Sequence, residues 1–477
     1  MLFLESVGEW SFDFTQYDTV WKFIIQFLLL LAFLLLGNTL RRVIPFLRKA
    51  FIPSALIGGF LFLVVNILVK WIFQIDIIDK RIMQIITYHA LAIGFIAMSL
   101  KIVEKGKDRL GNQAIKNGLL TGSTYMLQAL LGLGVSLIFF AFGWEKFYDA
   151  GVILPLGFGQ GPGNALTWDL IFSGMEDASF NGQGSFGLTI ASLGFIVASV
   201  VGVIYINHYK RKGEIAVKEA NLERKVTDFE SEKEIEDSES VDKLSIQIAF
   251  IGISYLLAFG IMMLFKYLTD WTGVALFNNI AWGFNFIFGV VTATLVKTIV
   301  KVLEKKKVMS RRYINNYQMD RLSGFAFDMM IVAGVAAIDI NIVRDYIWLI
   351  VALTLVGTIG TFIYVKLIAS KCFHNIRHES FLINFGTLTG TASNGVILLR
   401  EIDPNYETPT SNIYIFSQFP AMLTVAPLLL LLNMGAQSLT KCLITVGIFA
   451  LLFVVYNVLL FLSSKNIILK DQRNDNN

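Results

Sequence analysis

The sequence contains few charged residues for its length. Asp, Glu, Lys and Arg make up only 16% of its 477 residues, whereas hydrophobic residues make up 55%. Soluble domains carry roughly 25% charged residues. This shortage argues against an ordinary soluble domain, whose surface needs more charge. The net charge of +4 is also small. Because the basic residues lie in short loops between apolar runs, we do not expect nucleic-acid binding.

Cysteine and histidine are scarce as well. The two cysteines, Cys372 and Cys442, are too few for a disulfide framework. The four histidines show no metal-ligand spacing, and no paired-aspartate or Ser–His motif stands out. We therefore predict no catalytic residues, no bound metal centre and no enzymatic activity. The first residues lack a basic stretch, so a cleaved signal peptide is not expected.

Long hydrophobic runs are abundant and lie along the whole chain. Runs of about 18 or more apolar residues are typical of transmembrane helices. The sequence predicts an all-α polytopic membrane protein of about ten or eleven spans, near 21–40, 51–73, 83–100, 118–143, 186–207, 245–266, 272–296, 323–340, 346–368, 412–434 and 440–463. Two further segments, 152–173 and 381–399, are apolar but rich in Gly, Ser, Thr and Asn.

A charged segment, 208–244, divides the chain into two membrane halves. It contains runs such as Lys210-Arg211-Lys212 and has the composition of a solvated linker. A regulatory or docking role is the alternative. The expected organisation is an N-terminal half (1–207), the linker, a C-terminal half (245–464) and a polar tail (465–477), and the helix at 440–463 is an addition to two five-helix halves.

The distribution of basic residues predicts the topology. Cytoplasmic loops are enriched in Lys and Arg. The only charged residues before Lys22 are acidic, so we place the N-terminus outside and the C-terminus in the cytoplasm. The basic loops then alternate correctly only if 152–173 enters and leaves the membrane on the outer side and 381–399 on the inner side. Both segments are therefore predicted to be re-entrant hairpins.

The two hairpins share a short motif. Phe158 to Ala165 and Phe385 to Ala392 both read F-G-x-x-x-G-x-A, and both precede the fifth span of their half. Such halves with opposite polarity are the inverted repeats of secondary transporters. Glycine permits close backbone approach to a ligand. We expect the tips to meet at mid-membrane and bind substrate through Gly159, Gln160, Gly161, Gly163, Asn164, Gly386, Thr387, Thr389, Gly390, Thr391, Ser393 and Asn394. Close helix packing is the alternative explanation for the glycines, and it is the role that we assign to Gly132 and Gly134.

Three polar residues within the spans are candidate ion ligands. Asp328 lies in an apolar run, and His89 occupies the corresponding place in the first half. Intramembrane ionisable residues indicate function by default. Asp328 could instead cap its helix near the headgroups. Gln128 could bind an ion or a neighbouring helix. Neither hairpin contains Lys or Arg before Arg400, so helix N-termini, hydroxyl groups or Arg400 would have to bind an anion.

The chain resembles the bacterial sodium/glutamate symporter family. Ile52 to Gly59 is similar to the family's I-P-x-x-x-x-G-G, and Gly159 to Ala165 is similar to its G-x-G-x-G-x-A. The second hairpin also matches, although Gln160 and Pro162 depart from the family's pattern. The resemblance implies sodium-coupled symport of glutamate or a related small carboxylate. An ion channel or uncoupled pore, and more remotely an intramembrane enzyme or sensor, are the alternatives. The oligomeric state stays open, with a homodimer as one alternative.

Overall fold

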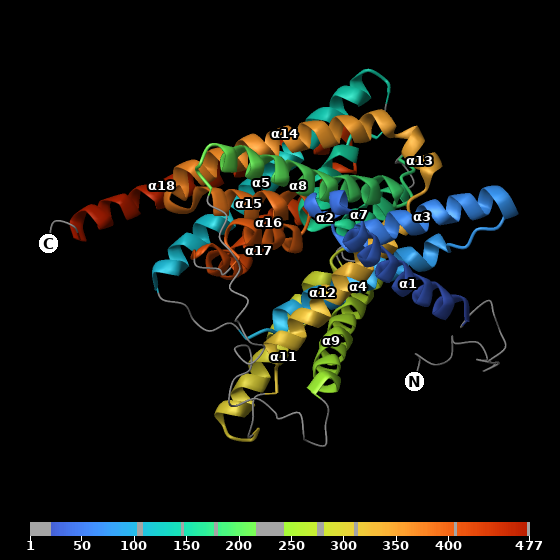
Figure 1. The fold of residues 1–477 in the computed structure, drawn as a ribbon, viewed down its shortest axis with the longest axis horizontal. Helices are drawn as coiled ribbons and strands as arrows, with labels where there is room; N and C mark the ends of the chain where they lie inside the picture. The colour runs from blue at the N-terminus through green and yellow to red at the C-terminus, as the bar shows by residue number, and fades with distance from the viewer. Residues whose placement is uncertain are drawn as a thin grey trace.

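The computed structural model describes residues 21–102, 108–144, 147–175, 180–215, 243–273, 281–309, 313–404 and 408–474. Within these ranges every regular element is a helix (Figure 1). The elements are α1 (Lys22–Val43), α2 (Pro45–Lys49), α3 (Ser54–Phe73), α4 (Lys80–Leu100), α5 (Asp108–Ala141), η2 (Ala150–Val152), α6 (Ile153–Pro155), η3 (Leu156–Gln160), α7 (Pro162–Ser173), α8 (Ser185–Arg211), α9 (Lys243–Thr272), α11 (Asn285–Lys305), α12 (Asn316–Ala336), α13 (Ile340–Asp345), α14 (Ile347–Cys372), η5 (His374–Ile376), α15 (Arg377–Thr389), α16 (Ala392–Ile402), α17 (Thr410–Gly435) and α18 (Leu439–Asn474).

The chain is a multi-pass membrane protein, as its composition predicts. In the described ranges, nine helices are long and apolar enough to cross a membrane, and α17 is a tenth if its two parts, bent by 46° near Pro420, form one span. The helix α12 is not among them, because its first turns, from Asn316 to Arg321, are polar.

Two predicted boundaries differ from the structure. The span predicted at 272–296 begins too early, because α9 continues to Thr272 and α11 begins only at Asn285. The tail predicted from residue 465 is helical as far as Asn474, since residues 465–474 contain neither glycine nor proline. Most of the predicted linker, 216–242, lies outside the described residues, as does the N-terminus before residue 21.

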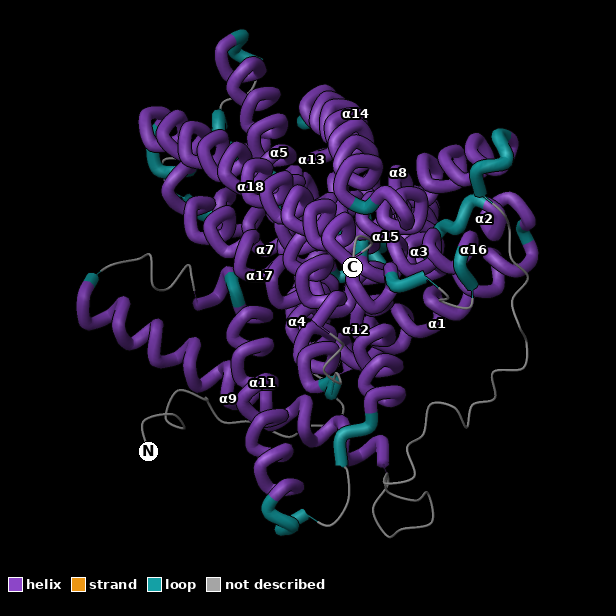
Figure 2. The backbone as a smooth tube through the Cα atoms, turned by 90° about the vertical axis from the view of Figure 1, so that its left-hand side faces the viewer, coloured by secondary structure: helices purple, strands orange, loops and turns teal. Residues whose placement is uncertain are grey.

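One group of six helices shows the same pairings twice. α1 packs on α3 as α9 packs on α11; α3 then contacts α12 as α11 contacts α4. The helices α4 and α12 pack on each other at the centre (Figures 1 and 2). Ion pairs join them at both ends: Lys80 pairs with Asp339 just beyond α12, and Lys101 Nζ lies 2.5 Å from Asp320. We call this group of six helices, α1, α3, α4, α9, α11 and α12, the scaffold.

The remaining helices surround the two segments that the sequence singles out. α5 packs along α14, α17 and α18, and α8 contacts α7, α15 and α16. If the pairings of the first group were repeated here, α14 would contact α8 as α5 contacts α17. Instead, α5 and α17 make extensive contact, whereas α14 and α8 contact each other less. Close approach of backbone is part of this packing: a Cβ added to Gly132 of α5 would lie 2.1 Å from Gly151 O. The segments are thereby held in the protein interior.

Candidate functional site

The first broken segment comprises the helical turns Ala150–Gln160 and, after an interruption, α7. Its turns η3 are π-helical, and the helix stops at Gly161, whose φ of 84° and ψ of −175° suit only glycine. Pro162, which lacks an N–H, then starts α7, the position where proline is best tolerated. The local sequence Gly161-Pro162 therefore accounts for the break.

The second broken segment comprises α15 and α16. α15 ends at Thr389, Gly390 turns the chain (φ −136°, ψ −104°), and extended Thr391 precedes α16. The two arms lie side by side, because a Cβ on Gly386 would come within 2.7 Å of Gly395 Cα. Gly386 is therefore a packing residue between the arms rather than a residue open to a ligand.

The two breaks meet. A Cβ added to Gly161 would lie 3.6 Å from Thr391 Cγ2. The helix α8 passes both segments at Gly194, where an added Cβ would lie 2.4 Å from Thr389 O and 3.1 Å from Phe158 Cδ1. Because Gly161 and Thr391 are the N-cap residues of α7 and α16, the positive ends of two helix dipoles lie together in the interior.

Unpaired polar atoms gather around these breaks. Asn164 Oδ1 in the first turn of α7, Asn394 Nδ2 in the first turn of α16 and Gln128 Oε1 on α5 are all buried without a hydrogen-bond partner. The three residues are at most 3% exposed. Leaving a buried polar group unpaired costs about 1–3 kcal/mol. Polar groups from three helices therefore remain available to a ligand at the breaks.

Gln128 connects α5 to the end of α15. Its Nε2 donates to Leu388 O at 2.8 Å and to Thr361 Oγ1 of α14 at 2.9 Å, while Oε1 stays free. A carbonyl from the last turn of a broken helix, a hydroxyl and an amide oxygen are the ligand types that a hard cation prefers. The sequence provides no signal for Thr361, because an isolated threonine in an apolar span usually bonds its own helix.

Other residues predicted for the first segment have more local roles. Gln160 Oε1 accepts from Asn164 Nδ2 at 2.7 Å and so orients that amide. Gly159 faces Tyr125 of α5, and Gly163 faces Leu91 of α4, since Cβ atoms there would approach those side chains within 2.5 and 2.8 Å. These two glycines permit close packing beside the break.

The same holds for part of the second segment. Thr387 Oγ1 donates to Ile383 O, and Thr389 Oγ1 donates to Phe385 O, so both hydroxyls bond the preceding helical turn. Ser393 is exposed. Thr391 is half-buried, and its hydroxyl donates to Asn394 Oδ1 at 3.2 Å.

The structure does not bring the predicted ion ligands His89 and Asp328 into contact with the breaks. His89 Nδ1 lies 2.6 Å from Tyr255 Oη of α9. Asp328 is partly buried, one helical turn from Phe325, which is 46% exposed, whereas Met330 is the α12 residue that reaches Gly161.

Arg400 is exposed in the last turn of α16. The helix N-termini and amides, rather than this guanidinium, therefore stand at the breaks.

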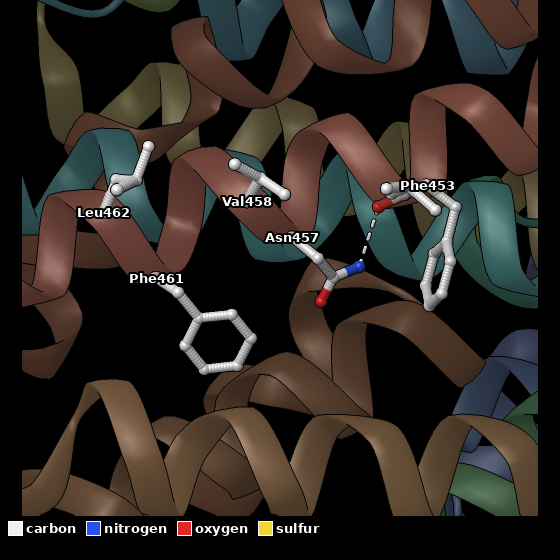
Figure 3. Close-up of a pocket in the computed structure, with 6 residues that line it drawn as sticks. Phe453, Asn457, Val458, Phe461 and Leu462 are labelled. Carbon is white, nitrogen blue, oxygen red and sulfur yellow. Dashed lines mark hydrogen bonds between the residues drawn. The ribbon is translucent and has the colours of Figure 1, made fainter.

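A groove of about 380 Å³ lies elsewhere, on α18 (Figure 3). Its lining is apolar except for Asn457. The Asn457 amide is bonded at both ends, since Nδ2 donates to Phe453 O at 2.8 Å and Oδ1 accepts from Tyr364 Oη at 2.9 Å. This mainly apolar groove differs in kind from the breaks, where buried polar atoms lack partners.

No protein-family model matches the chain, and no curated protein matches it significantly. The resemblance to the sodium/glutamate symporters therefore rests on the motifs alone and stays a prediction.

Proposed function

We propose that this protein is a secondary active transporter that carries a small carboxylate, such as glutamate, together with Na⁺ by alternating access. The observation that carries the proposal is the meeting of two broken helices in the interior, with free polar atoms on Asn164, Asn394 and Gln128. Irregular backbone at membrane depth is tolerated where it is buried in protein or lines a cavity.

The adjacent starts of α7 and α16 favour an anionic substrate. Each helix N-terminus presents free N–H groups and a partial positive charge. The amides of Asn164 and Asn394, in the first turns of these helices, add an unpaired acceptor and an unpaired donor. A donor and an acceptor together suit an amino acid, which carries both a carboxylate and an ammonium group.

The end of α15 favours a cation. Leu388 O lies in the last turn, where helix carbonyls lack intrahelical partners, and Gln128 Oε1 beside it is unpaired. The negative end of the α15 dipole adds to this preference. We place the coupling Na⁺ here, one helix break away from the substrate, so that each would raise the affinity for the other.

The repeated pairings in the scaffold support an inverted repeat. α1, α3 and α4 contact the second half as α9, α11 and α12 contact the first. In our proposal the two broken segments are re-entrant from opposite faces of a bacterial plasma membrane, with the N-terminus outside. Segments of this length can each reach about half of a ~30 Å hydrocarbon core, so their breaks would meet near its middle.

The decisive experiment is uptake of labelled glutamate into proteoliposomes that contain the purified protein. We expect accumulation against the glutamate gradient when Na⁺ is high outside, and loss of accumulation when a sodium ionophore removes the gradient. Equilibration of glutamate at the same rate with and without Na⁺ would contradict symport and indicate an uncoupled pore. Competition by other amino acids and dicarboxylates would define the substrate.

A further inference from the structure

A buried carboxyl group stands at the start of the first broken segment, outside the site described above. Asp149 is 1% exposed and is the residue directly before η2. Its Oδ2 has no hydrogen-bond partner, and its Oδ1 is contacted by the Cys442 thiol of α18 at 3.5 Å. A single weak thiol donor cannot compensate a buried negative charge.

The surroundings of Asp149 lack a positive charge in the described part of the chain. The titratable groups that face it are Tyr148, beside it, and Cys442. Tyr148 Oη donates to Ala436 O at 3.1 Å and holds the segment to the turn between α17 and α18. Lys441, next to Cys442, is exposed and donates to Gln437 Oε1 instead.

The backbone of Gly435 packs closely against the carboxyl group of Asp149. A Cβ on Gly435, at the end of α17, would lie 2.8 Å from Oδ1 and 3.2 Å from Oδ2 of Asp149, so the glycine backbone covers both oxygens. The neighbouring thiol is a soft ligand, whereas Na⁺ prefers several oxygens. Burial of an unpaired ionised carboxylate costs far more than burial of the neutral acid.

We propose that Asp149 is a proton-binding site that controls the position of the first broken segment. With the proton bound, the neutral acid packs under Gly435 and the segment stays against the α17–α18 turn. When the proton leaves, the carboxylate needs water, and the segment separates from the turn. The part that this motion plays in transport rests on the proposed function, but the proton site itself does not.

The first test detects the proton directly. In infrared difference spectra between the wild-type and Asp149→Asn proteins at neutral pH, we expect the carbonyl band of a protonated carboxylic acid. Asp339, which is paired with Lys80, is the matched control, and its Asp339→Asn difference should show carboxylate bands instead. Carboxylate bands from Asp149 at neutral pH would overturn the proposal.

The second test uses Cys442 as a reporter of separation. Because the chain has two cysteines, Cys372→Ser leaves Cys442 alone. We expect the alkylation rate of Cys442 to rise more steeply with pH in the Cys372→Ser variant than in the Cys372→Ser, Asp149→Asn double variant. The difference can reach about tenfold per pH unit, because release of one proton opens the segment. Thiol ionisation also differs between the two variants, because the Asp149 carboxylate 3.5 Å away disfavours the thiolate. That effect alone would make alkylation rise at lower pH in the double variant, which is opposite to the expected difference. Equal pH profiles would overturn the control of position.

A third variant covers the case in which Asp149→Asn fails to fold. Gly435→Ala introduces a Cβ against both Asp149 oxygens and should raise Cys442 alkylation already at neutral pH. Unchanged alkylation would contradict the packing on which the proposal depends. These measurements need neither substrate nor a gradient, so their failure would leave the transport assay unaffected, and failure of transport would leave them interpretable.

Discussion

The two broken segments share a motif, but they are enclosed to different degrees. Residues 150–158 and 161–169 of the first are all buried, whereas α16 of the second has exposed residues such as Ser393 and Arg400. The first is also pinned by the Gly132–Gly151 contact with α5. If the broken segments move during transport, the exposed face of α16 opposes movement less than the enclosed first segment does, and Asp149 is our candidate for releasing the first segment.

The largest expected effect is at the first break. Gly161→Ala should destabilise the protein by about 1–3 kcal/mol and abolish uptake, because its φ of 84° and ψ of −175° strain any other residue. Gly390→Ala should be milder, since the nearest atom, at 2.9 Å, belongs to the movable Asn394 side chain. Thermal unfolding and proteoliposome uptake would measure both.

The matched control for these glycines is Gly134→Ala. A Cβ there meets nothing within 4 Å, so the packing role predicted for Gly134 is wrong, and alanine should be neutral or slightly stabilising. Gly132 is unsuitable as a control, because its close contact with Gly151 would make alanine disruptive. If Gly161→Ala behaves like Gly134→Ala, the first break does not need its left-handed glycine.

The second effect compares an asparagine that has an unpaired amide nitrogen with one whose amide nitrogen is already hydrogen-bonded. Asn394→Ala should raise the half-saturating substrate concentration about tenfold, the equivalent of one hydrogen bond, with little change in thermal stability. Asn384→Ala should do the reverse, because Asn384 Nδ2 is already bonded to Asn117 Oδ1 and Ser380 O. Equal substrate affinities in Asn394→Ala and wild type would remove Asn394 from the site.

The third effect compares two candidate sodium ligands. Gln128→Leu should raise the Na⁺ concentration for half-maximal uptake about tenfold, because it removes the free oxygen near Leu388 O. If Asp328 is the ligand instead, Asp328→Asn should cause that shift and Gln128→Leu should not. Sodium titrations of uptake, with protein levels matched, distinguish the two outcomes.

Sequence reasoning located the helices better than the contacts of individual residues. Hydropathy finds α3 and α8 because each is one long apolar run, but it misjudges the start of α11, because the sequence before Asn285 is apolar too. The glycine motifs mark both breaks, yet they do not align: the chain breaks at Gly161 in the first copy and at Gly390, two positions later in the motif, in the second.

The roles of individual residues could not be predicted from the sequence, for a physical reason. Which glycine faces a helix and which faces a break depends on rotation about the helix axis, as Gly163 against Leu91 illustrates. Likewise, the charge of Asp328 within an apolar run predicts an ion ligand, whereas the uncharged Gln128 is the residue that contacts the second broken segment. Tertiary packing decides both cases.

The smallest expected effects separate two neighbours on the second break. Thr391→Val keeps the methyl group that faces Gly161 but removes the hydroxyl that orients Asn394. We expect a few-fold rise in the half-saturating substrate concentration, below the cost of a full hydrogen bond, because Asn394 itself remains. Ser393→Ala should change nothing, since Ser393 is exposed on the open face. A larger loss in Ser393→Ala than in Thr391→Val would mean that the open face of α16, rather than the buried meeting of the breaks, contacts the substrate.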